Sequence, residues 1–460
     1  MAFRPVVYWV SGRCLRWFYR EHRVVGYGRV PTSGPVLLVG NHPNDIPDVI
    51  AGLYLSPRHP RYIATVSATT NPMAKAMYDA MAVIPIARVR DARKMRAEGV
   101  DLAALNQAAN DTVQAALASG DVVAVFPEGG VHDVPEIGRL RTGVAKMVLE
   151  HLDTDAKNDV IIAPFGHQYE APRRWGSDLL SVLGEPWSAR AWLEAQAPDQ
   201  RGAAALTDRV REGVRSVTRN SATWDEAATR DELVAAAAGV MAPHNPLDAA
   251  PAFVARAAVL AAEALGDGPG VESVRVRTAA HALARAVERA GGIGSSSADM
   301  ARLLHGLGAH TSERTSALLP VSTFVLCLGL PAAAIGWALT GPVLPVVHAL
   351  AKRGTTQRAD FVAACFVPGL YVVLLWWLLV ALIGAGVFAA IGRSPLWALL
   401  LLVSLPRLGD FAMRWKAWFT AWRLVARART WGTVEREGLR EAAAVVRVWA
   451  LQGKYTHLEP

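Results

Sequence analysis

A histidine with two carboxylates close behind it is the feature of this sequence that most clearly suggests chemistry. Residues 41–48 read Asn-His-Pro-Asn-Asp-Ile-Pro-Asp, so Asp45 and Asp48 both follow His42 closely. An imidazole that a carboxylate holds by one ring nitrogen can remove a proton from a hydroxyl with the other. On a regular helix only Asp45 would share a face with His42, because six residues rotate by about 240°. Pro43 and Pro47 disfavour a regular helix here, so the spacing leaves both partners open.

Two other short segments place polar groups at the ends of apolar runs. Arg88 and Arg90 follow the run Ile-Pro-Ile-Ala, and Glu128 and Gly129 follow Phe-Pro. A guanidinium donates two parallel hydrogen bonds to a phosphate, which makes the arginines candidates for binding an anionic head group. Each segment also has a purely structural interpretation: helix-capping residues around His42, a solvated pair of arginines, and a plain turn closed by glycine.

Short apolar segments alternate with helical ones through the first 166 residues. The expected strands are 23–31, 36–39, 82–89, 121–126 and 160–165, and the expected helices between them are 48–54, 101–119 and 142–151. This alternation predicts an α/β fold with a mostly parallel sheet flanked by helices. Reactive groups collect on the loops beyond the carboxyl ends of such strands. The groups expected at these ends are His42, Arg88, Glu128 and Gly166, with His132 and His167 as loop residues.

Taken in order, these segments resemble the four sequence blocks of the glycerol-phosphate and lysophosphatidate acyltransferase superfamily (PlsC-like). The blocks are Asn41-His42 with Asp48, Ile84–Arg88, Phe126–Gly129 and Ile162–Gly166. Residues 206–224 and the later apolar spans look more loosely like the group that includes fungal glycerol-3-phosphate/dihydroxyacetone-phosphate acyltransferases. The resemblance gives Asp48, and not Asp45, the role of orienting the histidine. Two departures concern head-group recognition, one at Val131 and one in the run Arg-Arg-Trp-Gly-Ser at 173–177.

The resemblance implies a membrane-bound O-acyltransferase of phosphatidic acid and phospholipid biosynthesis. It would transfer an acyl group from acyl-CoA or acyl-ACP to glycerol 3-phosphate or 1-acylglycerol 3-phosphate, with His42 as the base and Asp48 as its partner. Arg88 and Arg90 would bind the phosphate. Glu128 with Gly129 would shape the acceptor pocket. No cofactor beyond the co-substrate is expected, and no metal, because the three cysteines have no metal-ligand spacing.

This interpretation has three alternatives. The first is acyl transfer to another lysophospholipid, and the second is a membrane scaffold whose acyltransferase domain is degenerate. The third, a lipid hydrolase, is disfavoured because the chain has no Gly-X-Ser-X-Gly nucleophile elbow.

The composition places this chemistry at a membrane. Hydrophobic residues make up 52% of the chain and charged residues 19%. Residues 315–351 contain no Lys, Arg, Asp or Glu, and residues 361–405 contain only Arg393. Each run exceeds the roughly 20 residues that a helix needs to cross a bilayer. Basic residues next to Trp and Tyr flank these runs and occupy the first 31 residues, so the net charge of +8 indicates a lipid surface rather than nucleic acid.

These features divide the chain into five expected parts. They are an amphipathic interfacial helix (1–22), an acyltransferase catalytic domain (23–202), a helical insert or linker (203–316), membrane-embedded helices or hairpins (317–405) and a basic amphipathic C-terminal segment (406–460). Prolines in the first apolar run predict a kinked or re-entrant span. The basic flanks favour a catalytic domain on the cytoplasmic face of the membrane.

Overall fold

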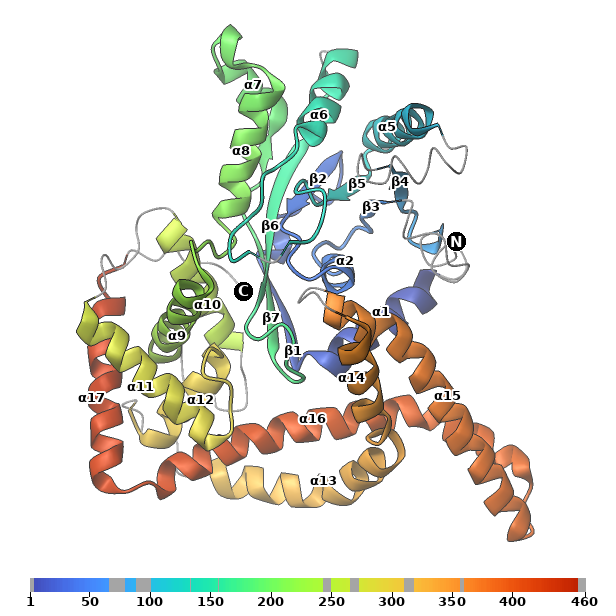
Figure 1. The fold of residues 1–460 in the computed structure, drawn as a ribbon, viewed down its shortest axis with the longest axis vertical. Helices are drawn as coiled ribbons and strands as arrows, with labels where there is room; N and C mark the ends of the chain where they lie inside the picture. The colour runs from blue at the N-terminus through green and yellow to red at the C-terminus, as the bar shows by residue number, and fades with distance from the viewer. Residues whose placement is uncertain are drawn as a thin grey trace.

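The computed structural model describes residues 4–453 except 66–78, 88–100, 133, 156, 243–249, 265–272, 310–317 and 356–359. Figure 1 shows a sheet covered by helices, a bundle of helices beside it, and a group of long helices along one side of the molecule.

The predicted α/β fold with a mostly parallel sheet is confirmed. The strands are β1 Glu21–Val25, β2 Val36–Gly40, β3 Arg61–Thr65, β4 Ile84–Ile86, β5 Val122–Val125, β6 Ile161–Tyr169, β7 Asp178–Leu183 and β8 Trp187–Ser188. They form one sheet in the order β1-β7-β6-β2-β5-β3-β4, with β8 paired to β6. The pairs from β6 through β2, β5 and β3 to β4 are parallel, as is β1 with β7. The pairs that β6 makes with β7 and β8 are antiparallel.

Helices pack on both faces of this sheet. Alternate residues of a strand face opposite sides, so β2 contributes Leu37 to one core and Leu38 to the other. Helices α5 (Leu102–Ala118), α6 (Gly143–Thr154) and α8 (Ala203–Arg215) cover the Leu37 side. Helices α1 (Arg4–Phe18) and α2 (Ile46–Gly52) contribute to the Leu38 side. Since α8 packs on the sheet, the core around the sheet continues past the expected boundary at 202.

The strands β3, β7 and β8 were not expected from the sequence, and the bounds of β1 and β6 differ from those expected. β1 begins and ends earlier than the predicted 23–31, and a 3₁₀ turn follows at Tyr27–Arg29. β6 does not stop before Gly166 but continues to Tyr169, because β7 pairs with its second half. Gly166 lies inside the strand where the backbone of Val217 approaches, and a Cβ there would come within 2.0 Å of the Val217 carbonyl oxygen. His167 is therefore a strand residue, and its placement in a loop was wrong.

A second unit of helices packs beside the sheet. It consists of α9 (Trp224–Met241), α10 (Ala250–Ala264), α11 (Val274–Ala290), α12 (Ser297–Leu307) and the C-terminal helix α17 (Thr433–Ala450), which share one apolar core. Many core positions are alanine, which lets the helices approach closely. The short helix α7 (Ala189–Ala195) links β8 to α8. The part of the expected insert or linker from α9 to α12 is thus a packed bundle, and α17 contributes to its core.

Among the residues that the structure describes, three helices are long and apolar enough to cross a membrane, judged by length and composition. The apolar region contains α13 (Leu318–Thr340), α14 (Val343–Gly354), α15 (Asp360–Ala390) and α16 (Ala398–Thr430), and the three candidates lie in α13, in α15 and around α16. Prolines were expected to break the first apolar run, but α13 continues as a helix through Pro331. The chain turns between the end of α13 at Thr340 and the start of α14 at Val343. α16 likewise runs through Pro406, across the boundary expected after 405. Figure 1 shows α13 and α16 side by side, with α15 projecting away from the rest.

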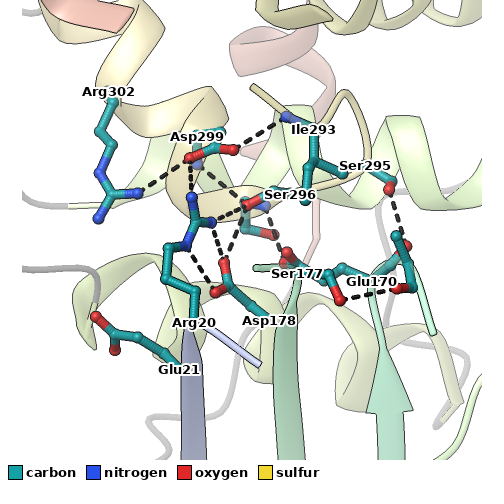
Figure 2. Close-up of polar contacts among 12 residues, drawn as sticks. Arg20, Glu21, Glu170, Ser177, Asp178, Ile293, Ser295, Ser296, Asp299 and Arg302 are labelled. Atoms are coloured by element: carbon teal, nitrogen blue, oxygen red, sulfur yellow. Dashed lines mark hydrogen bonds and ion pairs between the residues drawn. The ribbon is translucent and has the colours of Figure 1, made fainter. Parts of the chain in front are cut away.

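A buried ion network joins the bundle to the sheet (Figure 2). Arg20, just before β1, donates from Nε to Asp178 of β7 at 2.9 Å and from Nη1 to Asp299 of α12 at 2.7 Å. Arg302 and the backbone amide of Ile293 also donate to Asp299, each at 3.0 Å. The carboxylates are almost completely buried, with side-chain exposures of 0% for Asp178 and 1% for Asp299. Because its hydrogen bonds and opposite charges are in place, this network can hold the two units in one orientation.

We expect Asp299→Ala to lower the free energy of unfolding by about 3 kcal/mol at pH 7, because Arg20 and Arg302 would lose a buried counter-charge. Burial alone would raise the pKa of Asp299, but Arg20 and Arg302 hold it below its ordinary 3.8. The stabilisation is therefore present above pH 3.8 and is lost as the pH falls through the lower folded pKa. Chemical unfolding of the detergent-solubilised chain measures the difference in the free energy of unfolding between wild type and variant. Glu288→Ala, which removes an exposed pair with Arg285, serves as the control and should change stability little.

Candidate active site

The carboxyl ends of three neighbouring strands, β2, β5 and β6, carry the candidate site. His42 follows the end of β2 at Gly40, Glu128 follows the end of β5 at Val125, and Tyr169 is the last residue of β6. This is the edge of the sheet at which the sequence predicted that reactive groups would collect. Arg88 and Arg90, predicted to bind phosphate, lie outside the described residues.

Asp48, and not Asp45, is the hydrogen-bond partner of His42. The Nδ1 atom of His42 lies 2.9 Å from Oδ2 of Asp48, and the two residues are only 7% and 0% exposed. Asp45 has φ of 51° and precedes α2, so the chain turns there and brings the first helical turn, with Asp48, back toward the histidine. The two ring nitrogens therefore differ in their surroundings, because Nδ1 contacts the Asp48 carboxylate and Nε2 does not.

The Asp48 carboxylate is itself held by two further donors. The backbone amide of Asn44 donates to Oδ2 at 2.7 Å, and the Tyr169 hydroxyl donates to Oδ1. Burial raises the pKa of Asp48 above its usual value, and the hydrogen bonds from His42, Tyr169 and Asn44 oppose this shift. The carboxylate is fixed on both oxygens, so it can hold the imidazole in one orientation.

Contacts on either side of the histidine fix the loop that carries it. The side chain of Asn41 bonds the backbone of His167 in both directions, donating to the carbonyl at 3.0 Å and accepting from the amide at 2.7 Å. The imidazole of His42 stacks on the ring of Phe126, with centroids 4.1 Å apart and planes 7° apart. Asn44 donates to the Tyr19 hydroxyl at 2.8 Å. The position of His42 is thus determined by contacts near the ends of three strands and by Tyr19, which follows α1.

Glu128 organises the loops of the site. Its Oε1 accepts from the backbone amide of His42 at 2.7 Å, and its Oε2 contacts His132 and the backbone amide of Gly138. Gly129 has φ of 74°, and a Cβ there would come within 2.6 Å of the Arg141 side chain, so glycine suits this turn. His132 lies in a loop, as predicted, and its ring reaches the site through Glu128. Contact of Glu128 with an acceptor hydroxyl stays a prediction.

A cavity of about 500 Å³ opens beside these residues. Asn41, Asn44 and Glu128 line it on the side of the site. The arginines in its lining are Arg173 and Arg174, from the loop between β6 and β7, and Arg219 and Arg230, from the region of α8 and α9. Within the described chain, neither Arg173 nor Arg174 forms an ion pair with a carboxylate. Guanidinium groups at the rim of a cavity suit a phosphate ligand.

Several of these residues were not found from the sequence. Tyr169 was missed because β6 was expected to end too early. Arg219 was missed because it lies within residues 206–224, which carried only the looser family resemblance and no expected role at the site. Arg219 donates to the Tyr169 carbonyl at 2.6 Å and pairs with Asp231 of α9. No local pattern signals such contacts. His167 shares a hydrogen bond with Ser181 at 2.8 Å, and burial keeps its pKa well below the ordinary value. A purely structural role for His167 stays a prediction.

Comparison with known proteins identifies the part of the chain that carries this site. Residues 21–168 match the family model described as Acyltransferase. This segment belongs to the acyltransferase family. It contains all four sequence blocks and both His42 and Asp48, so the resemblance that the blocks suggested is confirmed for the acyltransferase domain.

Relatives of the domain include two yeast proteins. An uncharacterized acyltransferase of Schizosaccharomyces pombe is 40% identical over 76 residues, which are 16% of this chain and 11% of that protein. Glycerol-3-phosphate O-acyltransferase 1 of Saccharomyces cerevisiae is 31% identical over 106 residues, 22% of this chain and 14% of that protein. The chain therefore matches only a small part of the length of each of these relatives. Among solved structures, the 1-acyl-sn-glycerophosphate (LPA) acyltransferase PlsC of Thermotoga maritima aligns with TM-score 0.33 and 14% identity, over 46% of this chain and 78% of PlsC.

Proposed function

We propose that this chain is a membrane-bound glycerolipid O-acyltransferase that uses acyl-CoA or acyl-ACP to acylate glycerol 3-phosphate or 1-acylglycerol 3-phosphate. The observation that carries the proposal is the buried pair of His42 and Asp48, at 2.9 Å, inside the acyltransferase domain. A histidine whose Nδ1 is held by a carboxylate is suited to take a proton on Nε2.

The proposed reaction is a single displacement through a tetrahedral intermediate. Nε2 of His42 takes the proton of the acceptor hydroxyl as its oxygen attacks the thioester carbonyl and forms the C–O bond. Asp48 stabilises the resulting imidazolium. The C–S bond then breaks, and the proton passes from His42 to the departing sulfur, which leaves as the thiol. The atoms and charges balance without a covalent enzyme intermediate.

Arginine groups are proposed to hold the phosphate of the acceptor. Arg88 and Arg90 keep this proposed role from the sequence blocks. Arg173 and Arg174 are further candidates, because they line the cavity that Asn41 and Glu128 also border. A phosphate in that cavity would place a glycerol hydroxyl on the side of the sheet edge that carries the histidine.

Membrane association supports a lipid product. The described part of the chain has three helices long and apolar enough to cross a bilayer. One of them, α16, contacts α1 through Arg13, which pairs with Asp410 at 2.5 Å. The acyltransferase domain is thus attached to the apolar helices. We place it on the cytoplasmic face, because basic residues flank the apolar spans.

The purified full chain in mixed micelles, supplied with radiolabelled acyl-CoA, should acylate glycerol 3-phosphate. We expect its kcat/KM to be at least about tenfold higher than that for 1-acylglycerol 3-phosphate, because the looser sequence similarity is to glycerol-3-phosphate acyltransferases. Parallel reactions with acyl-ACP identify the donor. The absence of transfer to both acceptors from both donors would contradict the proposal, and release of free fatty acid alone would indicate a hydrolase.

A further inference from the structure

A second and larger cavity, of about 750 Å³, lies between α1, the start of β1, the turn from α11 to α12, and α16. Its lining includes Trp17 of α1 and Trp418 of α16. The wall formed by α16 belongs to a candidate membrane span, so the cavity borders the part of the molecule that would meet the bilayer. No residue of the sequence blocks lines this cavity. Of the residues proposed for the reaction, it shares Arg174 with the cavity beside His42.

The lining of this cavity is strongly basic. It includes eight Lys and Arg residues and three carboxylates. Each carboxylate already has an arginine partner: Asp410 pairs with Arg13, Asp299 with Arg20 and Arg302, and Glu21 with Arg23. The acids therefore do not neutralise the remaining five cations.

Those five cations are Arg16, Arg174, Arg414, Lys416 and Arg423. None of them forms an ion pair with a carboxylate in the described parts of the chain. Arg174 and Arg423 each donate one hydrogen bond to a backbone carbonyl, those of Gly292 and Gly291, which leaves further guanidinium donors. Five cations without counter-charges around one cavity make it a site for an anion.

Apolar surface adjoins the same cavity at Trp17. A crevice of about 10 Å³ between α1, α13, α14 and α16 shares Trp17 and Met413 with it. Another of about 40 Å³, between α1, α14 and α15, shares Trp17 and Trp175. Both are too small to enclose an acyl chain, but they show that apolar helix surfaces begin where the basic lining ends. A ligand that fits both surfaces has an anionic head and apolar tails.

We propose that this cavity binds the headgroup of an anionic phospholipid, whose acyl chains follow the apolar helices beside Trp17. A basic surface next to tryptophans and apolar spans is what a membrane interface selects. Free phosphate shares the headgroup chemistry but would gain nothing from the apolar surfaces. Neither His42 nor Asp48 lines this cavity, and Arg174 borders both cavities, so the inference does not depend on the proposed acyl transfer.

Native mass spectrometry of the delipidated full chain in detergent, titrated with phosphatidylglycerol, tests the proposal. We expect one bound lipid, with phosphatidylcholine bound at least about tenfold more weakly. The variant R16Q/R414Q should bind phosphatidylglycerol about 25-fold more weakly than wild type, because each basic residue near an anionic headgroup contributes about fivefold. The control K352Q/R353Q removes the same charge from exposed positions at the end of α14 and should bind as wild type does.

Three results would overturn the proposal: equal affinity of R16Q/R414Q and wild type, equal affinity for phosphatidylcholine and phosphatidylglycerol, or full competition by inorganic phosphate at the lipid concentration. If the double variant does not fold, Arg414→Gln alone should weaken binding about fivefold. Because the readout is lipid binding and not turnover, a failure here is separate from a failure of the proposed acyl transfer.

Discussion

Replacing His42 with alanine should reduce kcat for acyl transfer by about 10³-fold or more, with little change in KM for the acyl donor. The imidazole is the group whose Nε2 is proposed to take the hydroxyl proton, and Asp48 holds its other nitrogen at 2.9 Å. Without that base, the hydroxyl must attack the thioester with its proton in place. Single-turnover assays with radiolabelled acyl-CoA measure the chemical step directly.

The substitution His42→Ala also removes buried contacts of the imidazole, so a loss of activity could reflect a loss of folding. A second variant at position 42 separates the two effects. His42 stacks on Phe126, and its loss would leave the Asp48 carboxylate without one donor. His42→Asn retains an amide donor in the place of Nδ1 but has no group in the place of Nε2. It should be as inactive as alanine while unfolding close to the wild-type temperature. His281→Ala, at an exposed histidine of α11, should keep full activity. Near-normal turnover in folded His42→Asn would refute the base role.

Strands and helices whose formation depends on their own residues could be predicted from the sequence. The all-apolar β2 and β5 read as buried parallel strands, and the alternation of strands and helices gave the α/β fold. The same reasoning brought His42 and Glu128 to one sheet edge, because both follow parallel strands that are neighbours in the sheet.

Contacts between distant segments could not be predicted in this way. Whether β6 ends at Gly166 or at Tyr169 depends on pairing with β7, which the residues of β6 do not reveal. The helical bundle contains α17, which lies more than a hundred residues beyond α12 in the sequence, and no local periodicity links them. Arg20 read as one of several interfacial arginines, yet it is the centre of a buried network, since its two carboxylate partners come from β7 and α12.

The hydrogen-bond partner of His42 differs from the one that helical spacing favours. Helical geometry favoured Asp45, because it shares a helix face with His42. The chain does not continue as a helix from His42: Asp45 adopts φ of 51°, and α2 begins only at Ile46. The turn brings Asp48 back to the histidine, in agreement with the sequence blocks. Asp45 instead occupies the N-cap position of α2 without a capping hydrogen bond from its side chain.

Asp48→Asn should therefore lower kcat by about 10²-fold to 10³-fold, whereas Asp45→Asn should change it by less than about threefold. The amide at 48 can still accept from His42 and Asn44 on one atom, but it has no charge to stabilise the imidazolium. Asparagine at 45 tolerates the positive φ, so the turn is preserved. The two variants alter charge and size identically, and comparison of kcat and KM for both substrates isolates the role of position. A larger loss of kcat in Asp45→Asn than in Asp48→Asn would show that the 2.9 Å pair is not the one that catalysis uses.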